Sequence, residues 1–143
     1  MAIDISIRSC RPDECGEILG LWRDAGSIPS VSDSIDALKQ VLQADEELLL
    51  VAEYRGRIIG TVMGGWDGWR GNIYRLAVLP EYRLRGAGRK LVGEVERRLG
   101  NRGASKISIM VEKSEDMAVA FWDSMKKDNY QQDERITRYV KSI

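Results

Sequence analysis

The stretch "LAVLPEYRLRGAGRKLV", residues 76–92, decides how this chain folds, because one kind of secondary structure gives way to another within it. Its first four residues are apolar, as in a strand at the centre of a sheet, and Pro80 ends that run. After "GAG", apolar residues recur at helical spacing, namely Leu91, Val92, Val95 and Leu99. The stretch therefore predicts a strand, a tight loop and a helix that begins at or near Gly86.

The loop brings positive charge and bare backbone together at the start of that helix. The first four backbone N–H groups of a helix have no internal partner, and they lie at the positive end of the helix dipole. Gly86 and Gly88 carry no side chain that would keep a ligand away from these donors, and Arg83, Arg85 and Arg89 add cations nearby. This combination predicts a receptor for phosphate, more specifically for a pyrophosphate. In the alternative interpretation, the glycines only make the turn and the arginines form a solvated face.

The glycine spacing argues against two familiar phosphate-binding loops. A P-loop needs two glycines five residues apart followed by Lys and Ser or Thr, a pattern that "GAGRKL" does not match. A Rossmann fingerprint would require glycine where Leu91 stands, and its glycines should follow the strand directly, whereas "PEYRLR" intervenes. Glu112 follows the next predicted strand at a distance that suits a ribose-binding carboxylate. Dinucleotide binding is therefore the rival hypothesis.

The rest of the sequence predicts one mixed α/β domain over residues 1–143. Apolar patterning predicts strands at 3–8, 47–54, 57–66, 72–79 and 105–111, and a final strand is expected at 136–143, with a further short strand near "NYQQ", 129–132. Helical spacing predicts four helices, two of them before residue 45, one after "GAG" and one over 114–125. Asp13 is expected to cap the first helix, and Ser32 or Asp33 the second.

Composition narrows the class of protein. Of 143 residues 43% are hydrophobic, and no apolar stretch approaches the roughly 18 residues of a membrane span. The start "MAIDISIRSC" does not resemble a secretory signal, so we expect a cytoplasmic protein with no membrane partner. The 22 basic and 22 acidic residues balance, which argues against nucleic acid as a partner. Residues 83–102, however, carry 7 basic and 2 acidic side chains, so positive charge collects on the opening stretch.

The chain contains no histidine and only two cysteines, Cys10 and Cys15. Neither a disulfide framework nor a metal site is expected from so few ligands, and the two thiols are expected to be buried. Without histidine the usual general base near neutral pH is missing. Any proton transfer must therefore use carboxylates, tyrosine, water or the backbone.

The opening stretch closely resembles the acetyl-CoA-binding segment of the GCN5-related N-acetyltransferase (GNAT) superfamily. The signature of that segment is Arg/Gln-x-x-Gly-x-Gly/Ala, and Arg83, Gly86 and Gly88 match its three fixed positions. "VAEYRGRIIGTVMGG" resembles the second and third strands of the family, and "AVAFW" its final helix. Small bacterial members related to ribosomal-protein alanine acetyltransferases are the most similar subgroup. The resemblance implies a mostly antiparallel sheet of six to seven strands with four helices, in which strands 4 and 5 are parallel and splayed.

The resemblance also implies how acetyl-CoA, the co-substrate, would be held. The loop residues that it assigns to the pyrophosphate are Arg83, Leu84, Arg85, Gly86, Ala87, Gly88 and Arg89. The strand residues Leu76, Ala77 and Val78 would separate from the neighbouring strand over 107–111. Their backbone would pair with the pantetheine arm and donate to the thioester carbonyl. No metal is expected.

An amine would then attack that carbonyl directly and expel the thiolate. The resemblance thus implies an N-acetyltransferase that acts on a primary amine of a small molecule, a protein N-terminus or a lysine, as a monomer or homodimer. A non-catalytic acetyl-CoA-binding module is the alternative hypothesis.

The chain departs from the family near its final helix. Similar members often carry asparagine near the start of this helix and, seven residues later, a tyrosine that is taken as the acid for the departing thiolate. Here these positions hold Glu115 and Trp122, which the resemblance places beside the cofactor, although Trp122 also fits a core role. An indole N–H cannot give up its proton near neutral pH, so water would have to protonate the thiolate. "MKKDNY" replaces the family's "LGF" or "LGY" turn and indicates a local insertion.

The general base and the acceptor are less defined by the sequence. Asp67, Glu112 and Tyr74 are candidate bases by their position in the chain, and each also fits an ordinary surface or packing role. In the family the acceptor is selected by two connections, here "AGSIPSVSD" and "GWDGWRG". Trp66 and Trp69 flank Asp67 in the second of these, where they would either form a subsite for a cationic amine or pack the turn.

Overall fold

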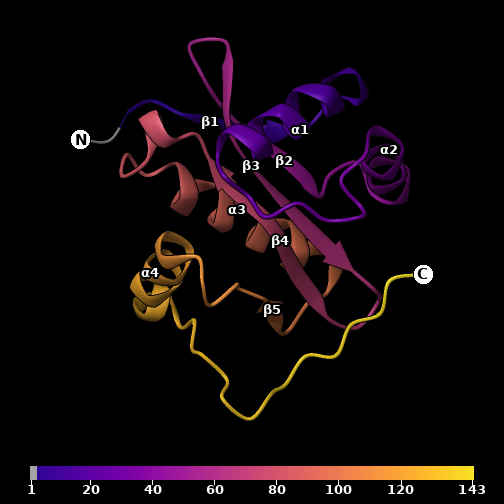
Figure 1. The fold of residues 1–143 in the computed structure, drawn as a ribbon, viewed down its shortest axis with the longest axis vertical. Helices are drawn as coiled ribbons and strands as arrows, with labels where there is room; N and C mark the ends of the chain where they lie inside the picture. Colours follow the sequence, from indigo (N-terminus) through magenta and orange to yellow (C-terminus); the bar gives the residue numbers. More distant parts are fainter. Residues whose placement is uncertain (1–2) are drawn as a thin grey trace. The chain divides into compact units, whose positions relative to one another are not determined.

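A computed structural model describes residues 3–143, which form two compact units, one ending at Ile109 and the other comprising Met110–Ile143. The first unit contains β1 (Ser6–Ser9), the 3₁₀ helix η1 (Pro12–Glu14), α1 (Cys15–Asp24), α2 (Ile35–Ala44), β2 (Leu49–Tyr54), β3 (Arg57–Trp66), β4 (Gly71–Val78), η2 (Pro80–Tyr82), α3 (Ala87–Arg102) and β5 (Ile107–Ile109) (Figure 1). The second unit contains α4 (Asp116–Ser124) and η3 (Met125–Asp128). That residues 1–143 act as one domain stays a prediction.

The strands of the first unit form one sheet in the order β1-β2-β3-β4-β5. Neighbours are antiparallel as far as β4, whereas β4 and β5 are parallel. Arg55 and Gly56 join β2 to β3 with φ angles of 50° and 76°, the paired positive values that suit the twist of a two-residue hairpin. The expected mixed α/β class, the four α-helices and the parallel fourth and fifth strands are therefore confirmed.

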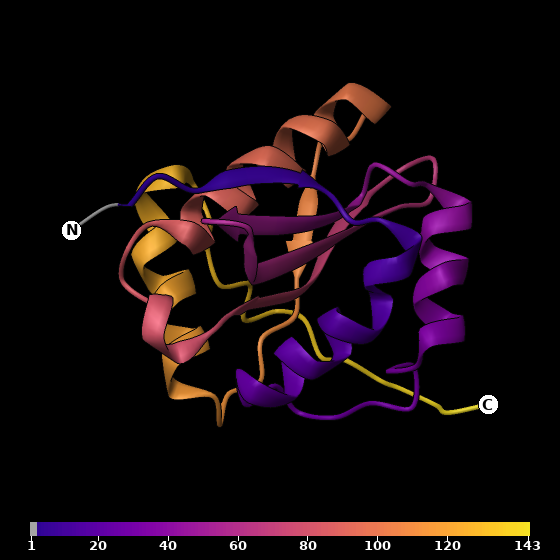
Figure 2. The same ribbon diagram turned by 90° about the horizontal axis from the view of Figure 1, so that it is seen from above.

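Helices cover both faces of this sheet, with α3 on one side and α1 and α2 on the other (Figure 2). Leu49 and Val51 of β2 belong to the buried cluster shared with α1 and α2. On the opposite face Gly64 of β3 allows α3 to come close, because a Cβ there would lie only 2.8 Å from Cγ2 of Val95. The sheet is thus buried on both sides, which holds β4 and the start of α3 in fixed positions.

The starts of the first two helices differ from the sequence expectation. The exposed Asp13 does not cap α1; instead the carboxylate of Glu14 accepts a hydrogen bond from the backbone N–H of Arg11 at 2.8 Å. Ser34 caps α2, since its Oγ accepts from the backbone N–H of Ala37 at 3.1 Å. Asp33 has another partner, the guanidinium of Arg75.

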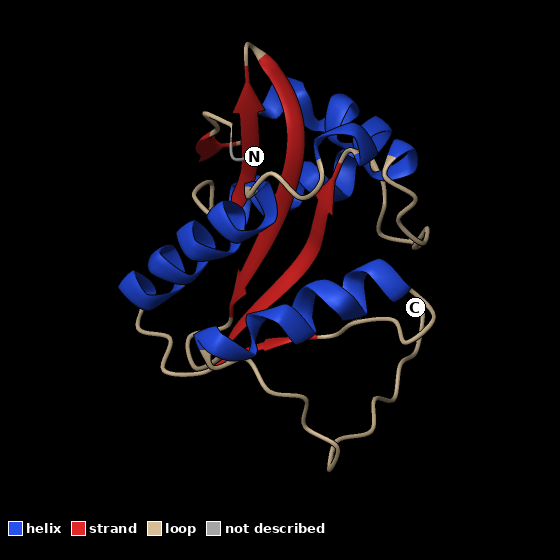
Figure 3. Cartoon of the chain, turned by 90° about the vertical axis from the view of Figure 1, so that its left-hand side faces the viewer, coloured by secondary structure: helices blue, strands red, loops and turns tan. Residues whose placement is uncertain are grey.

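The sheet has five strands rather than the predicted six to seven. Residues 130–143 of the second unit form neither helix nor strand, so the strands expected at 129–132 and 136–143 are wrong (Figure 3). Ile136 and Tyr139 are 68% and 92% exposed. β-Branched and aromatic residues raise β propensity, but a strand forms only where a neighbour pairs with it, and that neighbour is not encoded locally. β5 is likewise only three residues long, against seven expected.

Candidate functional site

The pairing between β4 and β5 ends partway along β4. Gly71, Asn72 and Ile73 pair with Ile107, Ser108 and Ile109, and within the described residues no β5 partner follows. On its other side β4 stays paired with β3, through Thr61↔Ala77 and Gly60↔Val78. Among the described residues, 76–78 therefore pair with a strand on one side only, and their other side is a strand edge that an extended ligand could pair with.

A short loop connects this strand edge to α3. The backbone N–H of Leu79 donates to the carbonyl of Ile59 at 2.9 Å, and that of Tyr82 donates to Leu79 at 2.9 Å, which closes η2. Leu84 has a φ of 62° and is 94% exposed. The loop therefore leaves the sheet, projects Leu84 outward and turns back into the helix.

The helix α3 begins at Ala87 with Gly86 as its N-cap, so it starts next to Gly86 as the sequence predicted. Gly86 has a φ of 91°, in the left-handed region, and an added Cβ would meet nothing within 4 Å. Because its N-cap residue is glycine, this helix has no side-chain cap from its N-cap position. Ala87 is buried and anchors the first turn, whereas Gly86 itself is exposed. The N–H groups and the positive dipole end of α3 therefore lie next to an exposed glycine, a setting that favours an anion.

The arginines of the loop differ in their surroundings. The half-buried Arg83 donates from Nε to the carbonyl of Val78 at 3.1 Å and from Nη2 to the carbonyl of Ala25 at 2.7 Å. Arg83 thus braces the loop against β4 and the end of α1. Arg85 is exposed and Arg89 half-buried, and both belong to the segment that carries the excess positive charge.

Asp67 lies in the turn at the opposite end of β4. Its Oδ1 accepts hydrogen bonds from the backbone N–H groups of Trp69 at 2.8 Å and Arg70 at 2.7 Å. These bonds, that of Arg70 first, lower the pKa of the Asp67 carboxyl, which weakens it as a base. The guanidinium of Arg70 covers the ring of Trp69 at 4.2 Å, and Trp66 packs beside Gly103 at the end of α3. This surrounding favours the turn-packing interpretation of the "GWDGWRG" connection.

Tyr74 lies on β4, one residue beyond the last pair with β5, where the sheet opens. Its ring covers the backbone of Gly65, because a Cβ on Gly65 would lie 2.9 Å from Cε2 of the ring. The side chain is 39% exposed. Of the three candidate bases, Tyr74 alone stands on the same strand as residues 76–78.

Glu112, Glu115 and Trp122 belong to the second unit. The carbonyl of Glu112 accepts from the backbone N–H of Glu115 at 3.0 Å, which precedes the first turn of α4. The ring of Trp122 makes edge-to-face contacts with Phe121 and Tyr130, at centroid distances of 5.2 and 5.0 Å. Trp122 is thus part of an aromatic cluster within its own unit.

Sequence reasoning missed one group of contacts around Arg75. This residue has a positive φ, and its guanidinium binds the carboxylate of Asp33 on the α1–α2 connection. Thr61, fully buried, donates to the carbonyl of Arg75 and accepts from the indole N–H of Trp22. The available signal was a charged residue and a threonine inside otherwise apolar strands.

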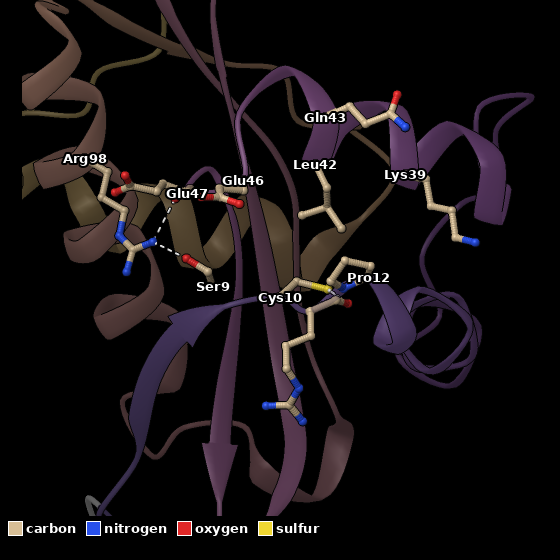
Figure 4. A pocket seen from close by; sticks show the side chains of 10 residues that line it. Ser9, Cys10, Pro12, Lys39, Leu42, Gln43, Glu46, Glu47 and Arg98 are labelled. Carbon is tan, nitrogen blue, oxygen red and sulfur yellow. Dashed lines mark hydrogen bonds between the residues drawn. The ribbon is translucent and has the colours of Figure 1, made fainter.

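A separate hollow of about 960 Å³ lies at the ends of β1, α2 and α3 (Figure 4). Its lining consists of Ser9, Cys10, Arg11, Pro12, Lys39, Leu42, Gln43, Glu46, Glu47 and Arg98. Burial raises the pKa of the Cys10 thiol to about 12, so this thiol stays protonated at neutral pH. No predicted site residue lines the hollow.

Comparison with known proteins gives the family. The acetyltransferase (GNAT) family profile matches residues 14–126. An acetyltransferase from Yersinia pestis (strain Pestoides F) is 36% identical over 121 residues, covering 85% of this chain and 86% of its own length. The chain therefore belongs to the GNAT acetyltransferase family and is an N-acetyltransferase enzyme.

Solved structures show the same fold. Ard1 from Thermoplasma volcanium superposes with a TM-score of 0.76 at 15% identity, over 85% of this chain and 81% of its own. The PaiA N-acetyltransferase from Thermoplasma acidophilum, in complex with coenzyme A, has a TM-score of 0.73 at 18% identity, over 85% and 88%. Among the described residues, no helix is long and apolar enough to cross a membrane.

Proposed function

We propose that this enzyme transfers the acetyl group of acetyl-CoA to a primary amine of a small molecule, a protein N-terminus or a lysine. The observation that carries the proposal is the uncapped start of α3 at Gly86, joined by a short loop to the one-sided strand 76–78. A pyrophosphate fits the first feature, and the amide-containing arm of coenzyme A fits the second. Family membership and the coenzyme A complex of the PaiA relative support this choice of ligand.

The loop residues 83–89 would bind the pyrophosphate. Gly86, Ala87 and Gly88 offer backbone donors, Arg85 and Arg89 offer charge, and Leu84 lies on the exposed outer edge. Arg83, which is bonded to Val78 and Ala25, would hold the loop in its binding shape. Glu115 and Trp122 would border the cofactor from the second unit.

The acetyl transfer would proceed by direct attack. The neutral amine nitrogen forms a bond to the thioester carbon, and the carbonyl electron pair moves to oxygen, where backbone N–H groups of residues 76–78 stabilise it. Collapse of this intermediate breaks the C–S bond and releases the thiolate. The nitrogen loses its proton to a base or to water, with Tyr74, Asp67 and Glu112 as the candidates, and the thiolate takes a proton from water because Trp122 cannot supply one.

Two measurements test this function. Coenzyme A should raise Tm more than NAD does at equal concentration. Thiol release from acetyl-CoA, followed with a panel of primary amines, should rise with pH as the amine deprotonates and then level off.

A larger Tm shift with NAD would favour dinucleotide binding. Coenzyme A binding without thiol release from any amine would favour the non-catalytic module. A falling rate near pH 9–10, about the pKa of a tyrosine, would instead assign the acid to Tyr74 or Tyr130.

A further inference from the structure

Arg75 stands at a bulge in β4. Between the pairs Thr61↔Ala77 and Met63↔Tyr74, β3 contributes one residue and β4 contributes two. Arg75 accommodates the extra residue with a φ of 53°, a left-handed conformation that is uncommon for residues other than glycine. Such a conformation persists only when the surrounding structure holds it.

The carbonyl and the guanidinium of Arg75 are both tied to Trp22 of α1. The hydroxyl of Thr61 donates to the carbonyl of Arg75 at 3.2 Å and accepts from Nε1 of Trp22 at 2.8 Å. The guanidinium of Arg75 lies 4.8 Å from the centroid of the Trp22 ring. Since Thr61 is 0% and Trp22 3% exposed, these contacts form a closed, buried ring between α1, β3 and the bulge.

The same guanidinium also attaches the connection between α1 and α2. Nη2 of Arg75 donates to both carboxylate oxygens of Asp33 at 2.7 Å, and Nη1 donates to the carbonyl of Ile28 at 2.9 Å. The side chains of Arg75 and Asp33 are only 19% and 20% exposed, so water screens this ion pair less than it screens a pair on the open surface. The connection over residues 25–34, which has no helix or strand, is therefore fixed to β4 at two points.

We propose that Arg75 and Asp33 are positioning residues that couple the 25–34 connection to the bulge of β4. The inference rests on the proposed function, because Arg75 directly precedes the residues whose backbone would hold the thioester carbonyl. The bulge sets the direction of the backbone groups that follow it, and the 25–34 connection borders the same strand. One ion pair thus keeps the 25–34 connection, which the family resemblance assigns to acceptor selection, in a constant geometry relative to the carbonyl side.

Amide hydrogen exchange tests the coupling without any substrate. In Arg75→Met the amides of residues 25–34 and 74–77 should exchange together, at least about 10-fold faster than in the wild type. Arg102→Met is the matched control, because Arg102 makes an equivalent two-point bond to Asp45, at 2.8 and 2.9 Å, from α3. It should speed exchange only around its own contact. Unchanged exchange over 25–34 in Arg75→Met would overturn the coupling.

Kinetics test the positioning role. With the amine that the wild type uses best, Arg75→Met and Asp33→Asn should lower kcat/KM for the amine by about 10- to 100-fold. The Kd for acetyl-CoA should stay within about 2-fold. Arg75→Lys keeps the charge but loses the planar guanidinium fork. Its kcat/KM for the amine should therefore lie between those of Arg75→Met and the wild type.

The two levels of the inference fail separately. If none of the tested amines causes the wild type to release thiol from acetyl-CoA, the proposed function is wrong. Hydrogen exchange then still decides whether the coupling exists. If exchange over 25–34 rises but amine kinetics equal those of the wild type, the positioning role is wrong. Should Arg75→Met not fold, Asp33→Asn alone carries both tests, since the amide keeps the shape of the carboxylate.

Discussion

The two ends of β4 adjoin turns that differ in whether a side chain accepts hydrogen bonds from their backbone N–H groups. Beyond Gly71, the turn is closed by Asp67, whose carboxylate accepts from the N–H groups of Trp69 and Arg70. At the Val78 end, the chain enters α3 through Gly86, an N-cap residue that has no side chain to accept from the helix N–H groups. The Asp67 turn supplies an acceptor for two of its own N–H groups, whereas the glycine before α3 supplies none, and we propose that a ligand takes that place.

Charge follows the same division. At the Asp67 turn the carboxylate accepts two backbone hydrogen bonds, and the guanidinium of Arg70 lies over the ring of Trp69. Both charged groups of this turn therefore interact with residues of the turn itself. At the Gly86 end, cations gather beside a helix start that carries no acidic residue in its first turn. A turn that neutralises itself is a structural element, whereas an excess of donors and positive charge indicates an anion site.

Gly86→Val should have the largest effect. Valine at a φ of 91° is strained, and its methyl groups would cover the N–H groups of the first turn. We expect calorimetry to show a Kd for acetyl-CoA raised about 100-fold, equivalent to about 2.7 kcal/mol. Gly56→Val is the control, since Gly56 also has a positive φ, 76°, and open space for a Cβ. A folded Gly86→Val protein with wild-type affinity would refute the assignment, and an equal loss in Gly56→Val would attribute the effect to folding.

The helix start was predictable because its signals are local. The positions of Gly86, Gly88 and the apolar residues of α3 lie within one short segment, and each reports on the backbone conformation or buried face of its own neighbourhood. Strand pairing is different. Residues 136–143 include β-branched and aromatic residues that favour a strand, yet they form none, because pairing depends on a neighbour elsewhere in the chain.

The contacts that complete the site were hidden for the same reason. Asp33 resembled a helix cap, since short polar loop residues look alike in sequence, but the guanidinium of Arg75, 42 positions away, took its carboxylate. Arg83 was expected on the phosphate, and its bond to the carbonyl of Ala25 depends on how α1 lies against β4. The residue types at these positions can be read from the sequence, but the hydrogen-bond partners of Asp33 and Arg83 are known only once the chain is folded.

Asp67→Ala should have a smaller effect, at the other end of β4. Losing the acceptor of two turn N–H groups should lower Tm and leave the Kd for acetyl-CoA unchanged. Because the folded turn lowers the pKa of Asp67, its stabilising contribution is present above the ordinary pKa of about 3.9 and is lost as pH falls through the lower, folded value. NMR should show the Trp69 and Arg70 amides following this titration while the Gly86 amide does not. If kcat instead falls sharply at unchanged Kd, Asp67 is the base and its turn is more than structural.

Gly93→Ala should have the smallest effect and the opposite sign. Gly93 lies in the same helix as the proposed anion site, but in the exposed interior of the helix, with no atom within 4 Å of an added Cβ. Alanine there reduces the freedom of the unfolded chain and should raise the free energy of unfolding by about 0.5–1 kcal/mol in urea denaturation. The Kd for acetyl-CoA should not change, because the first turn is untouched. Weaker binding in Gly93→Ala would mean that the coenzyme uses more of α3 than its start, so the contrast between the two ends of β4 would no longer locate the ligand.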